Sequence, residues 1–180
     1  MEGLSLRDIL AEIVAEKKEI VAAAKRKLTL ADIKSQINPD CFKMGHSFKK
    51  GDWNLIAECK LQSPAKGRLN STNTVTELAH IYEDNGAAML SVHTDPHFLG
   101  SNDDFIKVRK EIKLPLLRKD FVIDEYQLYE ARLLGANAVL LIARILSPAQ
   151  LKEYLFTTWS LGMDALVEVH DEADMKAALA

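Results

Sequence analysis

The sequence predicts an α/β protein whose parallel strands curve as in an eight-stranded α/β barrel. After residue 53, short apolar runs and helical patterns alternate five times, and such alternation requires parallel strands with right-handed crossovers. Polar residues follow each apolar run, where parallel α/β folds carry their chemistry. A barrel brings these ends to one mouth, whereas a doubly wound open sheet separates most of them, so we favour the barrel. The polar ends are Glu58, Lys60, His93, Asp95, Lys119, Asp120, Arg144, Glu168 and His170.

Length and composition limit the function classes. The 180 residues, 48% of them hydrophobic, suffice for one sizeable core. A net charge of −3 argues against nucleic acid or an anionic membrane as the main partner. No apolar run could span a bilayer, and Met1–Asp8 lacks the pattern of a secretory signal. Cys41 and Cys59 suggest neither a metal site nor a disulfide framework, so we expect a cytoplasmic protein without a metal.

The first part of the chain is predicted to be helical. Apolar residues recur at helical spacing from Leu6 to Leu28, behind a capping box at Ser5–Asp8. Thr29–Asp32 repeats the cap and begins a second helix that reaches about Ile37. Asn38-Pro39 ends this helix, because a residue before proline avoids the α region. The next residues, to about 53, are irregular.

The remaining elements alternate in order. Strands are expected at 55–58, 87–92, 114–118, 138–142 and 165–169, each a short run rich in aliphatic residues. Helices are expected at 74–85, 103–112, 126–134 and 148–161, with glycines closing three of them and a last helix after Asp171. Ser63–Gly67 is expected to be a loop. We therefore divide the chain into an N-terminal helical extension, residues 1–50, and the first five βα units of a barrel, residues 51–180.

Two lysines and two glutamates at strand ends are the candidates for chemistry. Partly desolvated Lys and Glu can shift toward neutral pH and act as general acid and base, and lysines attract carboxylates or phosphates. An ordinary set of salt bridges across a barrel mouth would use the same residue types. His93 and His97 are four apart, but Pro96 makes their segment a loop without a third ligand, and His170 is expected to help cap the last helix.

Several of these segments together resemble indole-3-glycerol phosphate synthase. The similar segments are Ile56-Ala-Glu-Cys-Lys60, Ser63-Pro-Ala-Lys-Gly67, Ser91-Val-His-Thr-Asp95 with Phe98, Leu117-Arg-Lys-Asp-Phe121, Ala138–Ile142 and Val167–Glu172. The N-terminal helix also resembles the family's extension. Two positions depart from the pattern: Ala65 stands where a second serine is usual, and His93 stands where an aliphatic residue is usual.

The resemblance implies an α/β barrel enzyme that needs no cofactor. Its substrate would be 1-(2-carboxyphenylamino)-1-deoxyribulose 5-phosphate, which loses CO2 and water as the indole ring closes. By the same resemblance, Lys119 is the general acid and Glu168 the carboxylate that assists dehydration. Lys60 anchors the substrate and can share the acid role, and Glu58 is the partner carboxylate. Ser63 would touch the substrate, while Phe121 and Leu140 would line the slot for its aromatic ring.

Two alternatives stay open. One is a phosphosugar isomerase of the same barrel class, like phosphoribosylanthranilate isomerase, which does not need the aromatic slot. The other is a non-catalytic, truncated barrel that binds a partner or an anion. Because the family's barrel has eight strands and this chain ends after the fifth βα unit, we expect open sheet edges that favour self-association. The inward faces would include Ile56, Leu90, Leu117, Leu141 or its neighbours, and Val167.

Overall fold

The structure is a computed structural model that describes residues 6–37, 48, 50–51, 53–63, 66–69 and 72–179. Several features discussed above lie outside these residues: the Ser5 cap, the Asn38-Pro39 helix end, Cys41 and Ala65. None of the described helices is both long and apolar enough to cross a membrane.

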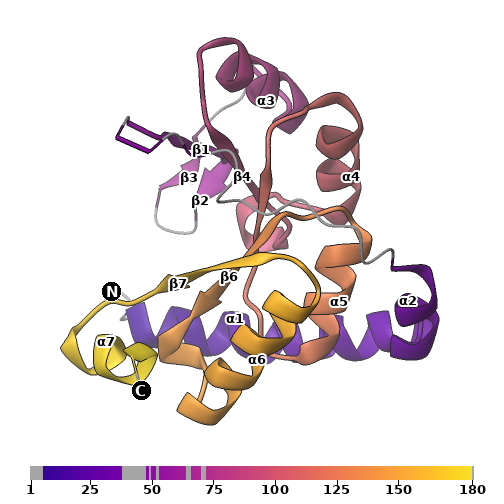
Figure 1. Ribbon diagram of the computed structural model, residues 1–180, viewed down its shortest axis with the longest axis vertical. Helices are drawn as coiled ribbons and strands as arrows, with labels where there is room; N and C mark the ends of the chain where they lie inside the picture. Colours follow the sequence, from indigo (N-terminus) through magenta and orange to yellow (C-terminus); the bar gives the residue numbers. More distant parts are fainter. Residues whose placement is uncertain are drawn as a thin grey trace.

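Five parallel strands form one sheet in the order β1-β4-β5-β6-β7, as the alternation predicted. The strands are β1 (Ile56–Cys59), β4 (Met89–His93), β5 (Leu116–Lys119), β6 (Ala138–Ile142) and β7 (Asp164–Glu168). The helices that follow them are α3 (Val75–Asp84), α4 (Asn102–Glu111), α5 (Glu125–Leu133), α6 (Pro148–Ser160) and α7 (Glu172–Leu179), with short 3-10 turns η2 (Pro96–Phe98) and η3 (Ala143–Ile145). Figure 1 shows α3 to α6 succeeding one another around the outside of the sheet.

Two further helices precede the sheet, α1 (Leu6–Lys27) and α2 (Leu30–Gln36). The predicted cap at Thr29 is confirmed, because its hydroxyl accepts from the Asp32 amide and the Asp32 carboxylate accepts from the Thr29 amide. Ile33 of α2 is buried against Tyr126 of α5, whose hydroxyl donates to the Leu28 carbonyl over 3.0 Å. These contacts attach the first two helices to the outside of α5.

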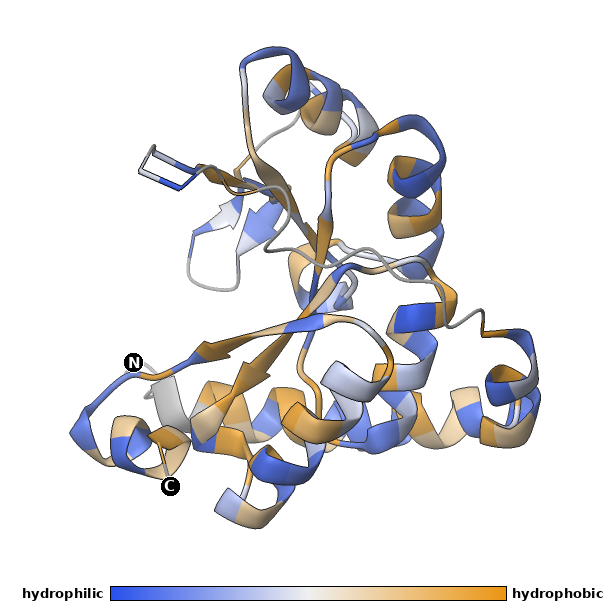
Figure 2. Cartoon of the chain, in the orientation of Figure 1, coloured by the Kyte–Doolittle hydropathy of each residue, from blue (hydrophilic) through white to orange (hydrophobic). Residues whose placement is uncertain are grey.

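The sheet buries a different set of side chains on each face, because side chains alternate along a strand. Figure 2 shows hydrophobic residues along the whole of β6, which supplies both faces. Of the expected inward set, Ile56 and Leu117 do lie together on the concave face, beside Met89 and Ala138. The prediction was wrong for Leu90 and Val167, which pack into the large cluster under the helices. Leu141 packs there as well, whereas its neighbours Leu140 and Ile142, which the prediction also allowed, lie on the opposite face. On these strands the residue next to the predicted one faces inward, because neighbouring side chains on a strand point to opposite faces.

Two short antiparallel strands, β2 (Gln62–Ser63) and β3 (Gly67–Arg68), lie at the two ends of the segment Ser63–Gly67, which was expected to be a loop. Gly67 has a φ of +66°, which a residue with a side chain rarely adopts. The Leu69 amide donates to the Leu61 carbonyl over 2.8 Å and closes this hairpin. The hairpin follows β1 directly, so it holds Ser63 next to the carboxyl ends of the strands.

Gly100 is required by the close approach of its backbone to the end of β4. A Cβ at this position would lie 2.4 Å from the His93 carbonyl oxygen and 2.9 Å from the Thr94 nitrogen. Both are backbone atoms, so the strand end itself would have to move. We expect Gly100→Ala to lower the free energy of unfolding by about 1–3 kcal/mol in urea denaturation. Lys107→Ala, on the exposed face of α4, is the control, and an equal effect of the two changes would contradict this explanation.

Candidate active site

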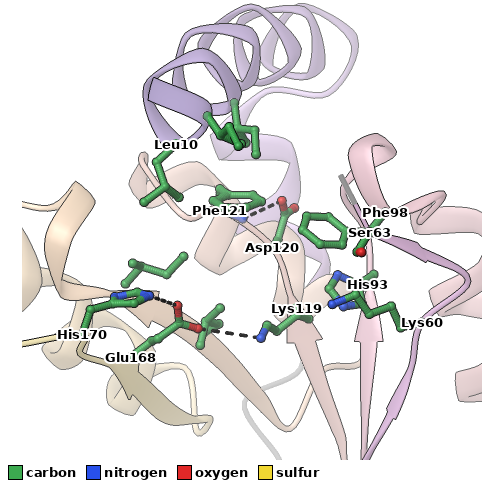
Figure 3. Close-up of a pocket in the computed structure, with 14 residues that line it drawn as sticks. Leu10, Lys60, Ser63, His93, Phe98, Lys119, Asp120, Phe121, Glu168 and His170 are labelled. Carbon is green, nitrogen blue, oxygen red and sulfur yellow. Dashed lines mark hydrogen bonds and ion pairs between the residues drawn. The ribbon is translucent and has the colours of Figure 1, made fainter. Parts of the chain in front are cut away.

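The carboxyl ends of the strands and helix α1 enclose a cavity of about 260 Å³ (Figure 3). Helix α1 supplies one apolar wall through Ile9, Leu10 and Ile13. Six of the seven predicted site residues line the cavity, namely Lys60, Ser63, Lys119, Phe121, Leu140 and Glu168. Glu58, the seventh, contacts both lysines at its edge. The structure therefore brings together all the side chains that the sequence proposed for one site, although they come from five elements.

Lys119, the last residue of β5, lies between two carboxylates. Its Nζ is 3.8 Å from Oε1 of Glu58 and 3.7 Å from Oε2 of Glu168. Both distances suit an ion pair but exceed a normal hydrogen bond. The two carboxylates therefore hold the ammonium group in place electrostatically, without a normal hydrogen bond to either, and Figure 3 shows its Nζ directed toward Glu168.

Glu58 is held as a carboxylate by its neighbours. Its Oε1 is 2.8 Å from Nε2 of His93, and its Oε2 is 3.8 Å from Nζ of Lys60. The hydrogen bond with His93 is the main cause that lowers the pKa of Glu58 from 4.5 to about 2; burial opposes the shift, and the charges of His93, Lys119 and Lys60 add to it. Glu58 is therefore ionised at neutral pH.

Glu168, at the end of β7, is paired with His170. Nε2 of His170 lies 3.2 Å from Oε1 of Glu168, so this histidine ring borders the cavity. The expected capping role belongs to its backbone, whose amide donates to Asp174, while Asp171 accepts from the Asp174 amide as predicted. The ring therefore lies at the mouth, where the polar strand ends were expected, while the backbone of the same residue takes part in the cap.

Aromatic rings form one side of the cavity. The ring of Phe98 stacks on His93 at 4.5 Å between centroids and lies 6.1 Å from the ring of Phe121. Nζ of Lys60 lies over Phe98 at 5.1 Å from its centroid, within cation–π range. With Leu140 these rings give a flat apolar surface beside the charged groups. Phe121 and Leu140 line the cavity, and so does His93, one of the polar strand ends expected at the mouth. Phe98 lines it too, although no role was predicted for it from the sequence.

Helix α1 is fixed over the cavity by a buried ion cluster. Nζ of Lys17, only 3% exposed, is 2.7 Å from Asp95 and 2.6 Å from Asp120. Asp120 also contacts Arg118, which in turn lies 2.6 Å from Glu130 on α5. Burial alone would raise the pKa of Asp120, but the charges of Arg118 and Lys17 outweigh it and hold that pKa below its usual range. The contacts of Lys17 with Asp95 and Asp120 thus bind α1 to the strand ends.

Not every polar strand end reaches the cavity, which corrects the expectation of a single mouth. Arg144 lies 2.5 Å from Asp171 and 3.2 Å from Asp174, at a neighbouring hollow under α7. Asp95 is buried in the ion cluster with Lys17 and does not line the cavity. Among the described residues, no three His, Cys, Asp or Glu side chains gather as a metal ion would need.

Comparisons with known proteins agree with this site. The family model for indole-3-glycerol phosphate synthase matches residues 10–180. The chain belongs to this family. Two indole-3-glycerol phosphate synthases are similar over nearly all of it: that of Ruminiclostridium cellulolyticum is 39% identical over 95% of the chain, and that of Bordetella pertussis 43% identical over 97%. That of Leptospira interrogans is 47% identical over 74% of the chain.

The chain is shorter than these synthases. It spans 68% and 70% of the length of the Ruminiclostridium and Bordetella proteins, and the match with the Leptospira protein covers 53% of that protein. All the cavity residues from Leu10 to His170 lie within the range matched by the synthase family. The fold expected for the family, an α/β barrel, agrees with the five parallel strands and their outer helices.

Proposed function

We propose that this protein acts as an indole-3-glycerol phosphate synthase. It would close the indole ring of 1-(2-carboxyphenylamino)-1-deoxyribulose 5-phosphate and release CO2 and water. The observation that carries the proposal is the position of Lys119, whose ammonium group lies 3.8 Å from Glu58 and 3.7 Å from Glu168 beside an aromatic surface. A proton donor, a carboxylate acceptor and a slot for an aromatic ring are what the reaction requires.

Lys119 serves as the general acid in ring closure. The aromatic carbon that bears the carboxylate attacks the sugar carbonyl carbon, and the carbonyl oxygen takes a proton from Lys119 as the new bond forms. Lys60 holds the anionic substrate and can share this role, since it also lines the cavity. Glu58 stays ionised, as its low pKa of about 2 requires, and keeps both lysines oriented.

Glu168 serves in the dehydration that follows. Loss of CO2 leaves its bonding electrons in the benzene ring, which becomes aromatic again. The hydroxyl group then takes a proton from Lys60, which shares the acid role, and leaves as water, and the five-membered ring gives up a proton to the Glu168 carboxylate as its double bond forms. His170, 3.2 Å from Glu168, orients this carboxylate toward the cavity.

Apolar side chains hold the aromatic part of the substrate. Phe121 and Leu140 contact the ring of the anthranilate, and Phe98 extends the same surface. Ser63, carried by the hairpin after β1, contacts the substrate from its place in the cavity lining beside Phe98. The apolar wall from α1 keeps water from the reacting carbons, which strengthens the electrostatic interactions there.

An assay with two substrates tests this proposal. We expect the protein to convert 1-(2-carboxyphenylamino)-1-deoxyribulose 5-phosphate to indole-3-glycerol phosphate and to leave phosphoribosylanthranilate unchanged. The absorbance of the indole product and the release of CO2 measure the reaction. Product from phosphoribosylanthranilate alone would favour an isomerase. Calorimetric titration with a reduced substrate analogue completes the test, because binding without turnover of either compound would identify a non-catalytic barrel.

We further propose a cytoplasmic protein that associates with itself through the edges of its sheet. Strands β1 and β7 are the edges of the five-stranded sheet, and Leu166 of β7 is 38% exposed. Unpaired edges and exposed apolar side chains favour strand pairing between chains. Sedimentation at a series of concentrations measures this association, and a monomer at all concentrations would contradict it.

The division of the chain into a helical extension, residues 1–50, and the βα units, residues 51–180, also stays a prediction.

A further inference from the structure

We propose that His93 is a positioning residue of this site: it binds the Glu58 carboxylate and thereby keeps it from forming direct hydrogen bonds with Lys119 and Lys60. The consequence for turnover rests on the proposed function, whereas the contact can be tested without it. His93 is one of the two positions, with Ala65, at which the resemblance described above departs from the family's pattern.

The order of the strands places His93 between Glu58 and Lys119. Glu58 comes from β1 and Lys119 from β5, and β4, which ends at His93, runs between these two strands. His93 pairs with Lys119 in the register of β4 and β5, so their side chains emerge at the same level. Figure 3 shows the His93 ring among Lys60, Lys119 and Phe98.

Packing fixes the His93 ring in this position. The ring is stacked on Phe98, with 4.5 Å between centroids and 17° between planes, and the residue is only 5% exposed. Behind it, Gly100 lies so close that a Cβ there would meet the His93 carbonyl carbon at 2.5 Å. A ring confined in this way presents Nε2 to Glu58 with little loss of conformational entropy on forming the hydrogen bond.

The distances around Glu58 indicate what this hydrogen bond does. Among the described residues, His93 makes the shortest contact to Glu58, 2.8 Å to Oε1, while Lys119 and Lys60 remain at 3.8 Å from the carboxylate. Oε1 is the oxygen that faces both His93 and Lys119. Without the histidine, Glu58 would be free to turn and form a direct, hydrogen-bonded ion pair with a lysine. That pair would occupy N–H donors that the substrate needs.

The charge on Glu58 supports the same role. Of the causes that lower the pKa of Glu58, the hydrogen bond from His93 is the largest, ahead of the charges of Lys119 and Lys60. The histidine therefore does more than fill space beside Phe98. A structural role alone, in which His93 served as an apolar stacking partner, would need no polar atom directed at Glu58.

Two substitutions separate the positioning role from a packing role. His93→Leu fills the site without a donor, and His93→Gln places an amide N–H near the position of Nε2. We expect His93→Leu to lower kcat roughly tenfold with a smaller change in KM, and His93→Gln to recover most of that loss. The matched control is His80→Leu, because His80 makes a similar contact, 2.9 Å to Glu111, on the surface of α3.

Ring nitrogen NMR tests the contact independently of turnover. With ¹⁵N-labelled histidine, we expect the proton of His93 to reside on Nε2 in the wild type and its resonance to shift in Glu58→Gln, while the His80 signals stay unchanged. If the His93 ring resonance has the same position in Glu58→Gln as in the wild type, the proposal is overturned. Equal losses of kcat in His93→Leu and His93→Gln would also overturn it. If the wild-type protein lacks synthase activity but the NMR result is as expected, the proposed function fails and the positioning contact stands.

Discussion

Replacing Lys119 with methionine is expected to lower kcat for indole-3-glycerol phosphate formation by about 10²–10⁴-fold, the range typical of a lost general acid. Methionine keeps much of the length and apolar stem of lysine but has no proton to give. The sugar carbonyl would then gain negative charge in the transition state without a donor. Glu58 and Glu168, at 3.8 and 3.7 Å from the ammonium group, would also lose the cation between them.

The kinetic pattern distinguishes a proton donor from an anchor. If Lys119 acts in the transition state, kcat falls and KM changes little; if it only binds the substrate, KM rises and kcat is kept. Lys110→Met, an exposed lysine on α4, is the control for the loss of one positive charge. Thermal melting checks that the variant folds, since Lys119 is partly exposed and its loss should cost little stability. Wild-type turnover in a folded Lys119→Met protein would remove Lys119 from the mechanism.

The parts of the fold that depend on local sequence could be predicted. Caps are set by neighbouring residues, and the capping boxes at Thr29 and Ser147 begin helices where expected. The parallel sheet followed from the alternation of strand and helix, which leaves few other topologies. The gathering of Lys119, Glu58 and Glu168 then followed, because the carboxyl ends of parallel strands meet at one edge of the sheet.

Features that depend on distant pairing could not be predicted. The polar side of α1 gave no sign that Lys17 is buried, because its partners Asp95 and Asp120 come from the ends of β4 and β5. Likewise, a continuous apolar strand such as β6 does not reveal which side chains face the helices, since both faces are buried. The sequence marked His93 as unusual, but only the structure placed its ring against Glu58.

Replacing Lys17 with methionine is expected to lower the free energy of unfolding by about 3–5 kcal/mol, the usual cost of removing one partner from a buried ion pair. Asp95 and Asp120 would remain buried and lose a cation at 2.7 and 2.6 Å. Asp120 keeps Arg118 at 3.2 Å and Asp95 keeps His97 at 2.8 Å, so each carboxylate loses the shared cation but retains one neighbour. Urea denaturation measures the change. Lys18→Met, the exposed neighbour on α1, is the control, and equal stability of the two variants would contradict a structural role for Lys17.

The pH dependence of this loss gives the prediction a second test. The pKa of Asp120 is lowered from 3.8 in the folded protein, so its pairing stabilises the fold above about pH 4, and this stability is lost as the pH falls through the lowered pKa. The wild type and Lys17→Met should therefore differ most near neutral pH and converge in acid. Adding Asp95→Asn to Lys17→Met should restore part of the stability at neutral pH, because it removes one buried carboxylate charge that the Lys17 ammonium group no longer neutralises. Hydrogen exchange would locate the effect in α1, whose Ile9, Leu10 and Ile13 form the cavity wall that Lys17 holds in place.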